Sequence, residues 1–178
     1  MRVIGGTARG VPLVAPEGRD TRPTSDRVRE SLFNILGPRV VDSRFLDLFA
    51  GTGAHGIEAL SRGAAYAALV ENSRAAGECI LKNAQKARVW ERGGLFRTAL
   101  PEALARLPKP YDIVVADPPY AYTAYADLLQ ALQQYEILAP QAIVVIEHER
   151  RTELPEMVGN LQRTRQAQYG DTVLSFYA

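Results

Sequence analysis

From residue 44 onward, short apolar runs alternate with amphipathic segments along the chain. The apolar runs are rich in Val, Ile and Leu, which is typical of strands that are buried on both faces. The segments between them place apolar residues three and four positions apart, as helices do. This alternation predicts an α/β protein with a mostly parallel sheet. The expected strands are 45–50, 66–71, 94–98, 111–116, 142–147, 161–168 and 172–177, and the expected helices are 57–62, 73–88, 100–106 and 123–135.

The two ends of the chain depart from this alternation. The last two expected strands flank the turn Tyr169-Gly170-Asp171, which predicts a C-terminal antiparallel hairpin in a seven-stranded sheet. At the other end, β-prone pieces around the glycines of residues 5–10 predict a hairpin or loose ribbon. A helix follows, with Thr24 or Ser25 as its cap, and it ends at residues 37–38. We therefore expect an N-terminal extension over residues 1–40 and a main domain over residues 41–178.

Composition narrows the class of protein. The chain has 178 residues, 47% of them hydrophobic, which suits one compact domain with a small appendage. No apolar run is long enough to cross a bilayer, no signal peptide opens the chain, and Cys79 is the single cysteine. These features favour a cytoplasmic protein, with a monomer as the default. Residues 1–44 carry eight arginines against five acids in a chain of net charge +1, which hints that this part contacts phosphates.

A glycine-rich turn, Gly51-x-Gly53-x-x-Gly56, lies between an expected strand and an expected helix. In that context glycines let the backbone approach a ligand, and the start of the helix favours negative charge. Glu71 comes twenty residues after Gly51, at the end of the next strand, where a carboxylate can accept both hydroxyls of a ribose. Taken separately, the glycines would be explained by an ordinary tight turn, and Glu71 by a solvated strand end. Together their spacing predicts a nucleoside site.

Asp47 indicates which nucleoside. It lies four residues before Gly51, inside the strand, where an anion suits a cationic amino-acid group better than a pyrophosphate. S-adenosylmethionine carries such a group, whereas a nicotinamide dinucleotide does not. Asp47 could instead accept hydrogen bonds from backbone amides of its own loop, and both roles can hold at once.

A second motif, Asp117-Pro118-Pro119-Tyr120, follows the buried run 111–116. Two prolines remove two backbone donors, so the strand must stop there. By itself the motif fits a strand terminator and a ligand site equally well. The carboxyl ends of strands are where ligands bind in open α/β sheets, so the glycine turn and Glu71 favour a site.

Together these motifs resemble those of class I S-adenosylmethionine-dependent amino-methyltransferases, which have a Rossmann-like fold. More narrowly, four stretches resemble the RsmD-type enzymes, which are bacterial 16S rRNA (guanine(966)-N2)-methyltransferases. These stretches are Arg2-Val-Ile-Gly-Gly6, Arg22-Pro-Thr-Ser-Asp-Arg-Val-Arg-Glu-Ser-Leu-Phe-Asn34, Glu58-Ala-Leu-Ser-Arg-Gly63 and Asp117-Pro-Pro-Tyr120. The resemblance implies methyl transfer to the exocyclic N2 of a guanine, with 16S rRNA in the small subunit or an assembly intermediate as partner.

The resemblance also implies roles for particular residues. The Asp117 carboxylate and the Pro118 carbonyl would accept hydrogen bonds from the target amine, and Tyr120 would stack on the flipped base. The cofactor-binding residues would be Asp47, Gly51, Gly53, Glu71, Asn72, Thr98, Ala99 and Thr24. The N-terminal extension, also called the leader below, would bind the rRNA backbone. Its contact residues would be Arg2, Arg9, Arg19, Arg22 and Arg27, with Arg29 as a further candidate.

Other interpretations remain open at this point. An amino-methyltransferase acting on adenine N6 of DNA or another RNA would share the core motifs and differ only in the leader. A nicotinamide-linked oxidoreductase is disfavoured by Asp47 and the Pro-Pro corner, and a non-catalytic assembly factor by the intact Asp117 motif. No metal is expected, because His55 and His148 are far apart in sequence. His55 is expected to be a polar surface group, and Ser61 has no suggestive context.

Overall fold

A computed structural model of the protein describes residues 1–16 and 23–178, apart from the side chains of residues 23–25. Two arginines of the expected RNA-binding set, Arg19 and Arg22, and the side chain of Thr24 lie outside the described residues. The helices are α1 (Pro23–Leu36), α2 (Ala54–Ser61), α3 (Arg74–Lys86) and α4 (Tyr125–Gln134), with 3-10 turns η1 (Gly37–Val40), η2 (Trp90–Arg92) and η3 (Glu102–Arg106). The strands are β1 (Arg44–Leu48), β2 (Tyr66–Val70), β3 (Gly93–Phe96), β4 (Tyr111–Ala116), β5 (Leu138–Glu149), β6 (Met157–Val158), β7 (Leu161–Tyr169) and β8 (Thr172–Tyr177).

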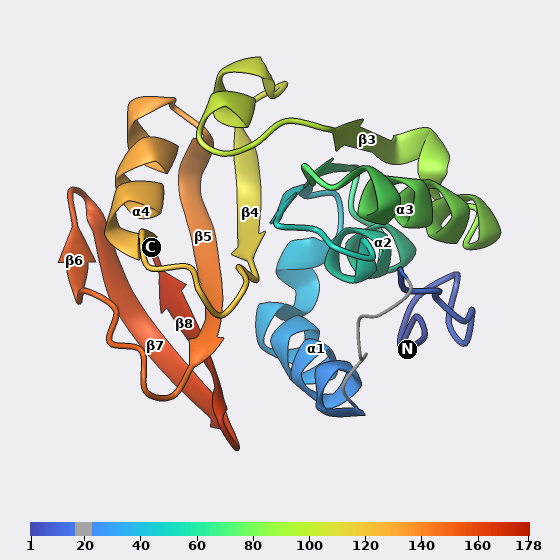
Figure 1. Ribbon diagram of the computed structural model, residues 1–178, viewed down its shortest axis with the longest axis horizontal. Helices are drawn as coiled ribbons and strands as arrows, with labels where there is room; N and C mark the ends of the chain where they lie inside the picture. The colour runs from blue at the N-terminus through green and yellow to red at the C-terminus, as the bar shows by residue number, and fades with distance from the viewer. Residues whose placement is uncertain (17–22) are drawn as a thin grey trace.

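The strands form one sheet in the order β3-β2-β1-β4-β5-β8-β7-β6 (Figure 1). Strands β1 to β5 pair in parallel, and β8, β7 and β6 pair antiparallel. The chain runs outward from β1 through β2 to β3, then returns to β4 on the other side of β1. The order therefore reverses between β1 and β4, and such a reversal leaves a crevice at the carboxyl ends of the strands.

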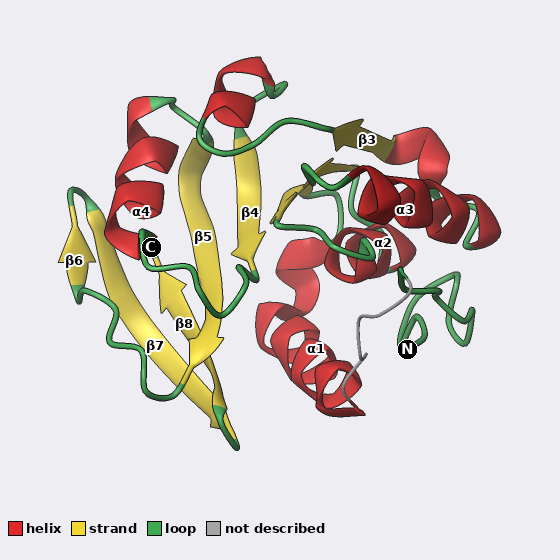
Figure 2. Cartoon of the chain, in the orientation of Figure 1, coloured by secondary structure: helices red, strands yellow, loops and turns green. Residues whose placement is uncertain are grey.

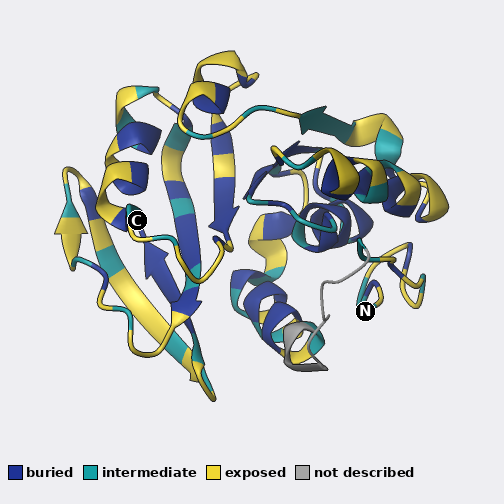
Figure 3. Ribbon diagram, in the orientation of Figure 1, coloured by how far each residue is buried: buried dark blue, intermediate teal, exposed yellow. Residues whose placement is uncertain are grey.

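Alternating side chains of the parallel strands face two different hydrophobic layers. On one side, apolar residues of α1, α2 and α3 pack on strand residues such as Phe45, Leu69 and Val115. On the other side, η3 and α4 pack on residues such as Leu46, Val114 and Ile146. Both layers are deeply buried (Figure 3), which explains why the parallel strands read as continuous apolar runs.

The N-terminal extension packs on this domain through buried polar groups of α2. The Glu58 carboxylate, 0% exposed, accepts hydrogen bonds from the Ile4 and Gly5 amides at 2.8 Å each. The Ser61 hydroxyl donates to the Gly5 carbonyl (2.6 Å) and accepts from the Ala8 amide (2.9 Å). Two of the four family-like stretches, the leader motif and the α2 motif, therefore meet in space. Ser61 has a structural role that its sequence context did not indicate.

Apolar residues of the extension complete the core. Val3, Ala8 and Leu13 belong to the hydrophobic cluster that α1 and α2 form with the sheet. Gly6 has a φ of +75°, and an added Cβ would lie 1.8 Å from the Ser61 carbonyl oxygen, so only glycine fits there. The extension is thus held by core packing as well as by hydrogen bonds.

Figure 2 shows the α/β pattern that the sequence predicts, with several local differences. Helix α1 begins at Pro23, so Thr24 and Ser25 lie in its first turn and are not its cap; proline suits this first position because its missing N–H has no helical partner. The expected helix 100–106 is a 3-10 turn that begins at Glu102, after Pro101. The expected N-terminal hairpin or loose ribbon is present as one bridge between Arg2 and Pro12, with backbone hydrogen bonds from the Val3 amide to the Val11 carbonyl and from the Leu13 amide to the Met1 carbonyl.

The sheet also has an eighth strand that the sequence did not predict. Strand β6 is only two residues long, Met157–Val158, and pairs with β7. So short a segment carries no detectable alternation of polar and apolar residues.

Within the described residues, no helix is both long and apolar enough to cross a membrane.

Candidate active site

The register of the sheet lines up the residues that end its central strands. Leu48 of β1 pairs with Val70 of β2 and with Ala116 of β4, and Ala116 pairs with Ile146 of β5. The residues that come next in the chain therefore lie at the same level. They are Phe49, Glu71, Asp117 and Glu147, and all four line one cavity. Three of them leave the sheet there, whereas Glu147 continues in β5 and pairs with Leu174 of β8.

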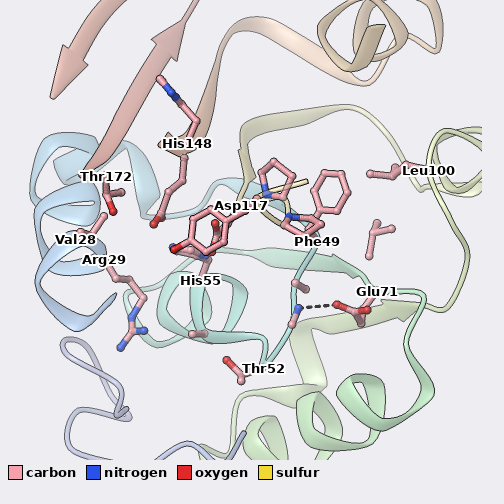
Figure 4. Close-up of a pocket in the computed structure, with 18 of the residues that line it drawn as sticks. Val28, Arg29, Phe49, Thr52, His55, Glu71, Leu100, Asp117, His148 and Thr172 are labelled. Carbon is pink, nitrogen blue, oxygen red and sulfur yellow. Dashed lines mark hydrogen bonds between the residues drawn. The ribbon is translucent and has the colours of Figure 1, made fainter. Parts of the chain in front are cut away.

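This cavity has a volume of about 700 Å³ and lies at the reversal of strand order between β1 and β4. Its size falls in the range of small-molecule sites. Figure 4 shows Glu71 and Leu100 on one side of the labelled set and Val28, Arg29 and Thr172 on the other, with Asp117 between them. Residues that line the cavity therefore lie on both sides of Asp117 in this view.

Glu71 is bound by the backbone on both of its carboxylate oxygens. Its Oε2 accepts a hydrogen bond from the Gly51 amide and its Oε1 from the Ser73 amide, both at 2.8 Å. The residue is only 7% exposed, so it is not a solvated strand end. A carboxylate has about four acceptor positions, so Glu71 can still accept from hydroxyl groups in the cavity.

The cofactor turn, defined here as residues 51–53, connects β1 to α2. Gly53 is the N-cap of α2 with a φ of 78°, a conformation that favours glycine. At Gly56 an added Cβ would meet the Leu69 side chain at 2.8 Å, so this glycine allows α2 to pack closely on β2. Gly51 has a positive φ as well, of 57°, so each glycine of the motif has a local structural reason.

Asp47 lies beneath the cofactor turn and is 0% exposed. Its Oδ2 accepts a hydrogen bond from the Gly56 amide at 2.9 Å, whereas its Oδ1 has no hydrogen-bond partner among the described residues. Burial raises the pKa of Asp47 to about 8, with smaller contributions from the charges of Asp117 and Glu71. The hydrogen bond to its own loop is present, and the second oxygen leaves capacity for a nearby cation.

The Asp117 corner, defined here as residues 117–120, forms another part of the cavity wall. The Asp117 amide donates to the Leu48 carbonyl at 3.4 Å, which ties the corner to β1. Pro118 is buried, and the Pro119 carbonyl accepts a hydrogen bond from the Tyr122 amide at 2.8 Å, which closes the turn. Tyr120 is 60% exposed at the rim of the cavity. The proline corner thus presents a carboxylate and an aromatic ring on a rigid backbone.

Aromatic residues support this wall from behind. The Tyr122 ring packs edge-on against Phe49, with 5.1 Å between centroids, and against Tyr125, with 5.2 Å. Phe49 has a φ of 61°, which is uncommon for a bulky residue and is often found at functional sites. Tyr122 and Tyr125 therefore pack against each other, and Tyr122 borders the site through Phe49.

Two residues of the cavity were assigned wrongly from sequence. His55 was expected at the surface, but it is half-buried in the wall of the cavity that Asp117 also lines (Figure 4), and burial lowers its pKa to about 3, so it is neutral. Arg29 was a further candidate for contact with the rRNA backbone, which requires an exposed side chain, but it is 2% exposed and lines the cavity. It donates to Asp26 at 2.9 Å and to the Arg2 carbonyl at 2.5 Å, and these contacts compensate for burial of the charge.

The structure brings most of the expected site residues together. Gly51, Glu71, Asn72, Thr98, Ala99, Asp117, Pro118 and Tyr120 all line the cavity, whereas Asp47 and Gly53 are buried next to it. Arg2, Arg9 and Arg27 are exposed outside it. Phe49, Leu100 and His148 also line the cavity, and sequence reasoning gave them no role in it. Among the described residues, no group of three or more His, Cys, Asp or Glu is placed to hold a metal.

Comparison with known proteins agrees with this geometry. The family model described as "Conserved hypothetical protein 95" matches residues 1–178. The chain is 38% identical to the putative rRNA methyltransferase YlbH of Bacillus subtilis, over 99% of this chain and 98% of that protein. It is 37% identical to the ribosomal RNA small subunit methyltransferase D of Escherichia coli, over 99% and 89%.

A solved structure, the putative methyltransferase yhhF of Escherichia coli, superposes with a TM-score of 0.85 at 37% identity, over 99% of this chain and 96% of that one. The expected class I methyltransferase fold is thereby confirmed. Because the family match spans the whole chain and close relatives cover nearly all of it, this protein belongs to the conserved hypothetical protein 95 family, the RsmD-like group that its motifs resemble.

Proposed function

We propose that this protein transfers a methyl group from S-adenosylmethionine to the exocyclic N2 of a guanine in 16S rRNA of the small ribosomal subunit, in the cytoplasm. The observation that carries the proposal is the single cavity in which Glu71 and the cofactor turn lie level with the Asp117 corner. One part of this cavity suits a nucleoside cofactor, and the adjacent part suits a planar amine. Relatives named as small-subunit rRNA methyltransferases support rRNA as the substrate.

The residues in the part of the cavity around Glu71 and the cofactor turn fit S-adenosylmethionine. Glu71 would accept hydrogen bonds from the ribose hydroxyls, with Asn72, Thr98 and Ala99 around the adenine. Asp47 is buried, and one of its oxygens has no hydrogen-bond partner in the described part of the chain, so a cationic amino-acid group nearby would stabilise its charged form. When bound, the cofactor supplies an electrophilic methyl group on a sulfonium.

The Asp117 corner acts on the target amine. The lone pair of guanine N2 is delocalised into the ring, which makes the amine planar and a poor nucleophile. The Asp117 carboxylate and the Pro118 carbonyl accept hydrogen bonds from the two amine hydrogens and so favour a pyramidal nitrogen with its lone pair aimed at the methyl group. The proton leaves after the nitrogen has become cationic, so Asp117 orients the amine and is not primarily a general base.

Tyr120 and the exposed arginines would hold the RNA. Tyr120 is 60% exposed at the rim, where its ring can stack on a base that has left its helix. Arg2, Arg9 and Arg27 are exposed and would contact phosphates. Arg29 is excluded from this set because it is buried.

The test is methyl transfer from labelled S-adenosylmethionine to under-methylated small subunits, with the modified base mapped by nuclease digestion and mass spectrometry. We expect label on N2 of one guanine of 16S rRNA, and label that accumulates at least about 100-fold more slowly with the Asp117→Ala variant at equal cofactor occupancy. Label on adenine N6, or on DNA alone, would show that the enzyme belongs to the alternative amino-methyltransferase class. Thermal protection by NAD in place of S-adenosylmethionine would refute methyl transfer altogether.

A further inference from the structure

Asn83 of α3 connects two segments of the site although it does not line the cavity. It is 1% exposed. Its Nδ2 donates hydrogen bonds to the Thr52 carbonyl at 3.0 Å and to the Val14 carbonyl at 2.9 Å, and its Oδ1 accepts from the Val14 amide at 2.9 Å. Thr52 is the middle residue of the cofactor turn, and Val14 belongs to the N-terminal extension. One buried side chain therefore joins the turn to the extension.

The chemistry of these contacts requires an asparagine. The Val14 amide can only donate, and the carbonyls of Val14 and Thr52 can only accept, so the partners also fix which side-chain atom is nitrogen. An asparagine amide supplies two donors and an acceptor in one plane. An aspartate would keep the acceptor but lose both donors, and an apolar residue would leave three backbone groups without this partner.

Both connected segments form the wall of the cavity. Thr52 lines it together with Met1 and Ala15 of the extension. The Thr52 hydroxyl also contacts the Met1 sulfur at 3.5 Å. The cofactor turn thus depends for its position on groups outside its own loop, and Asn83 provides the buried part of that support.

From these contacts we infer that Asn83 is a positioning residue, which holds the cofactor turn in its binding conformation through the Thr52 carbonyl and anchors the extension to the same point. The inference rests on the proposed function, because it assigns the turn to S-adenosylmethionine. Asn83 acts on cofactor affinity and not on the chemistry at Asp117.

The test measures S-adenosylmethionine binding by calorimetry without RNA, together with methyl transfer at saturating cofactor. For Asn83→Ala we expect a cofactor Kd about tenfold higher, the equivalent of roughly one net hydrogen bond, and a kcat within about twofold of the wild type. Asn83→Asp removes both donors while keeping the side-chain volume and the acceptor for Val14. It should raise Kd similarly and provides the measurement if the alanine variant does not fold.

Ser61→Ala is the matched control, because it removes contacts of the same extension with Gly5 and Ala8 without touching Thr52. We expect it to lower the Tm and leave the cofactor Kd unchanged. An unchanged Kd in folded Asn83 variants, or an equal rise of Kd in Ser61→Ala, would overturn the inference. Failure of the wild type to bind S-adenosylmethionine would instead refute the proposed function, so the two failures are distinguishable.

Discussion

Replacement of Asp47 by asparagine should make the protein more stable at alkaline pH. Asp47 is fully buried, with one oxygen on the Gly56 amide and the other without a partner among the described residues. Its pKa is raised from 3.8 to about 8, mainly by burial and further by Asp117 and Glu71. The folded protein therefore holds this proton more tightly than the unfolded chain does. Stability falls as pH rises through the interval from about 4 to about 8, where the folded form must ionise a buried group.

The size of the effect follows from this interval. For each pH unit between the pKa of Asp47 in the unfolded chain and its pKa in the folded protein, the free energy of unfolding changes by ~1.4 kcal/mol. Between about pH 5 and about pH 9, ionisation of Asp47 should cost the wild type on the order of 4 kcal/mol of unfolding free energy. Asp47→Asn keeps the acceptor for the Gly56 amide and cannot ionise. The unfolding free energy of this variant should therefore not fall in this way between the two pH values.

Urea unfolding followed by circular dichroism at both pH values, at constant ionic strength, measures the effect. Asp42→Asn is the control, because Asp42 is exposed and its replacement should leave the pH profile of the wild type unchanged. The stabilised Asp47 variant should also bind S-adenosylmethionine more weakly, since function commonly retains such unfavourable groups. Parallel profiles for the wild type and Asp47→Asn would refute this reasoning.

Three further substitutions separate the parts of the site. Asp117→Ala should lower kcat at least about 100-fold, as expected for a lost orienting group, with the cofactor Kd within about threefold; equal losses in both would make Asp117 a binding residue. Glu71→Gln places an amide donor against the Gly51 or Ser73 amide, so it should raise the cofactor Kd about tenfold or more while kcat at saturating cofactor changes little. Arg9→Ala should reduce the salt slope of RNA binding by about one, measured by filter binding, with exposed Arg106→Ala as the unaffected control. This single change is a better test than removal of the leader, because Val3 and Leu13 belong to the core.

Much of the fold and of the cavity could be predicted from local patterns. The alternation of apolar runs and amphipathic helices specifies a parallel sheet, since strands covered on both faces have no polar side. Asp117 and Glu71 were identifiable because each directly follows such a run, and strand ends meet at one edge of a parallel sheet. The glycine turn was identifiable because glycine is needed where the backbone has positive φ or close neighbours.

Other features depend on contacts between segments that are distant in sequence. Arg29 reads as a surface residue on α1, paired with Asp26 one turn earlier, and only the approach of Glu58 and of the Arg2 carbonyl makes its burial possible. His55 was predicted to be a polar surface group at the start of a helix. In the folded protein, the residues packed around it shield it from water, and this burial lowers its pKa to about 3. No local pattern carries this information, because burial depends on which surfaces are brought together.

The sequence by itself thus determined the class of fold, the ends of the strands that carry chemistry, and the family, since each depends on local spacing or on motifs. Only the tertiary structure decided how the parts are joined. It showed that Glu58 and Ser61 hydrogen-bond to the backbone of the leader, and that Asn83 connects the leader to the cofactor turn. It also showed that Asp47 is buried, which raises its pKa. The physical reason is that hydrogen bonding between distant segments and the loss of solvent are properties of the packed chain, which no single stretch of sequence contains.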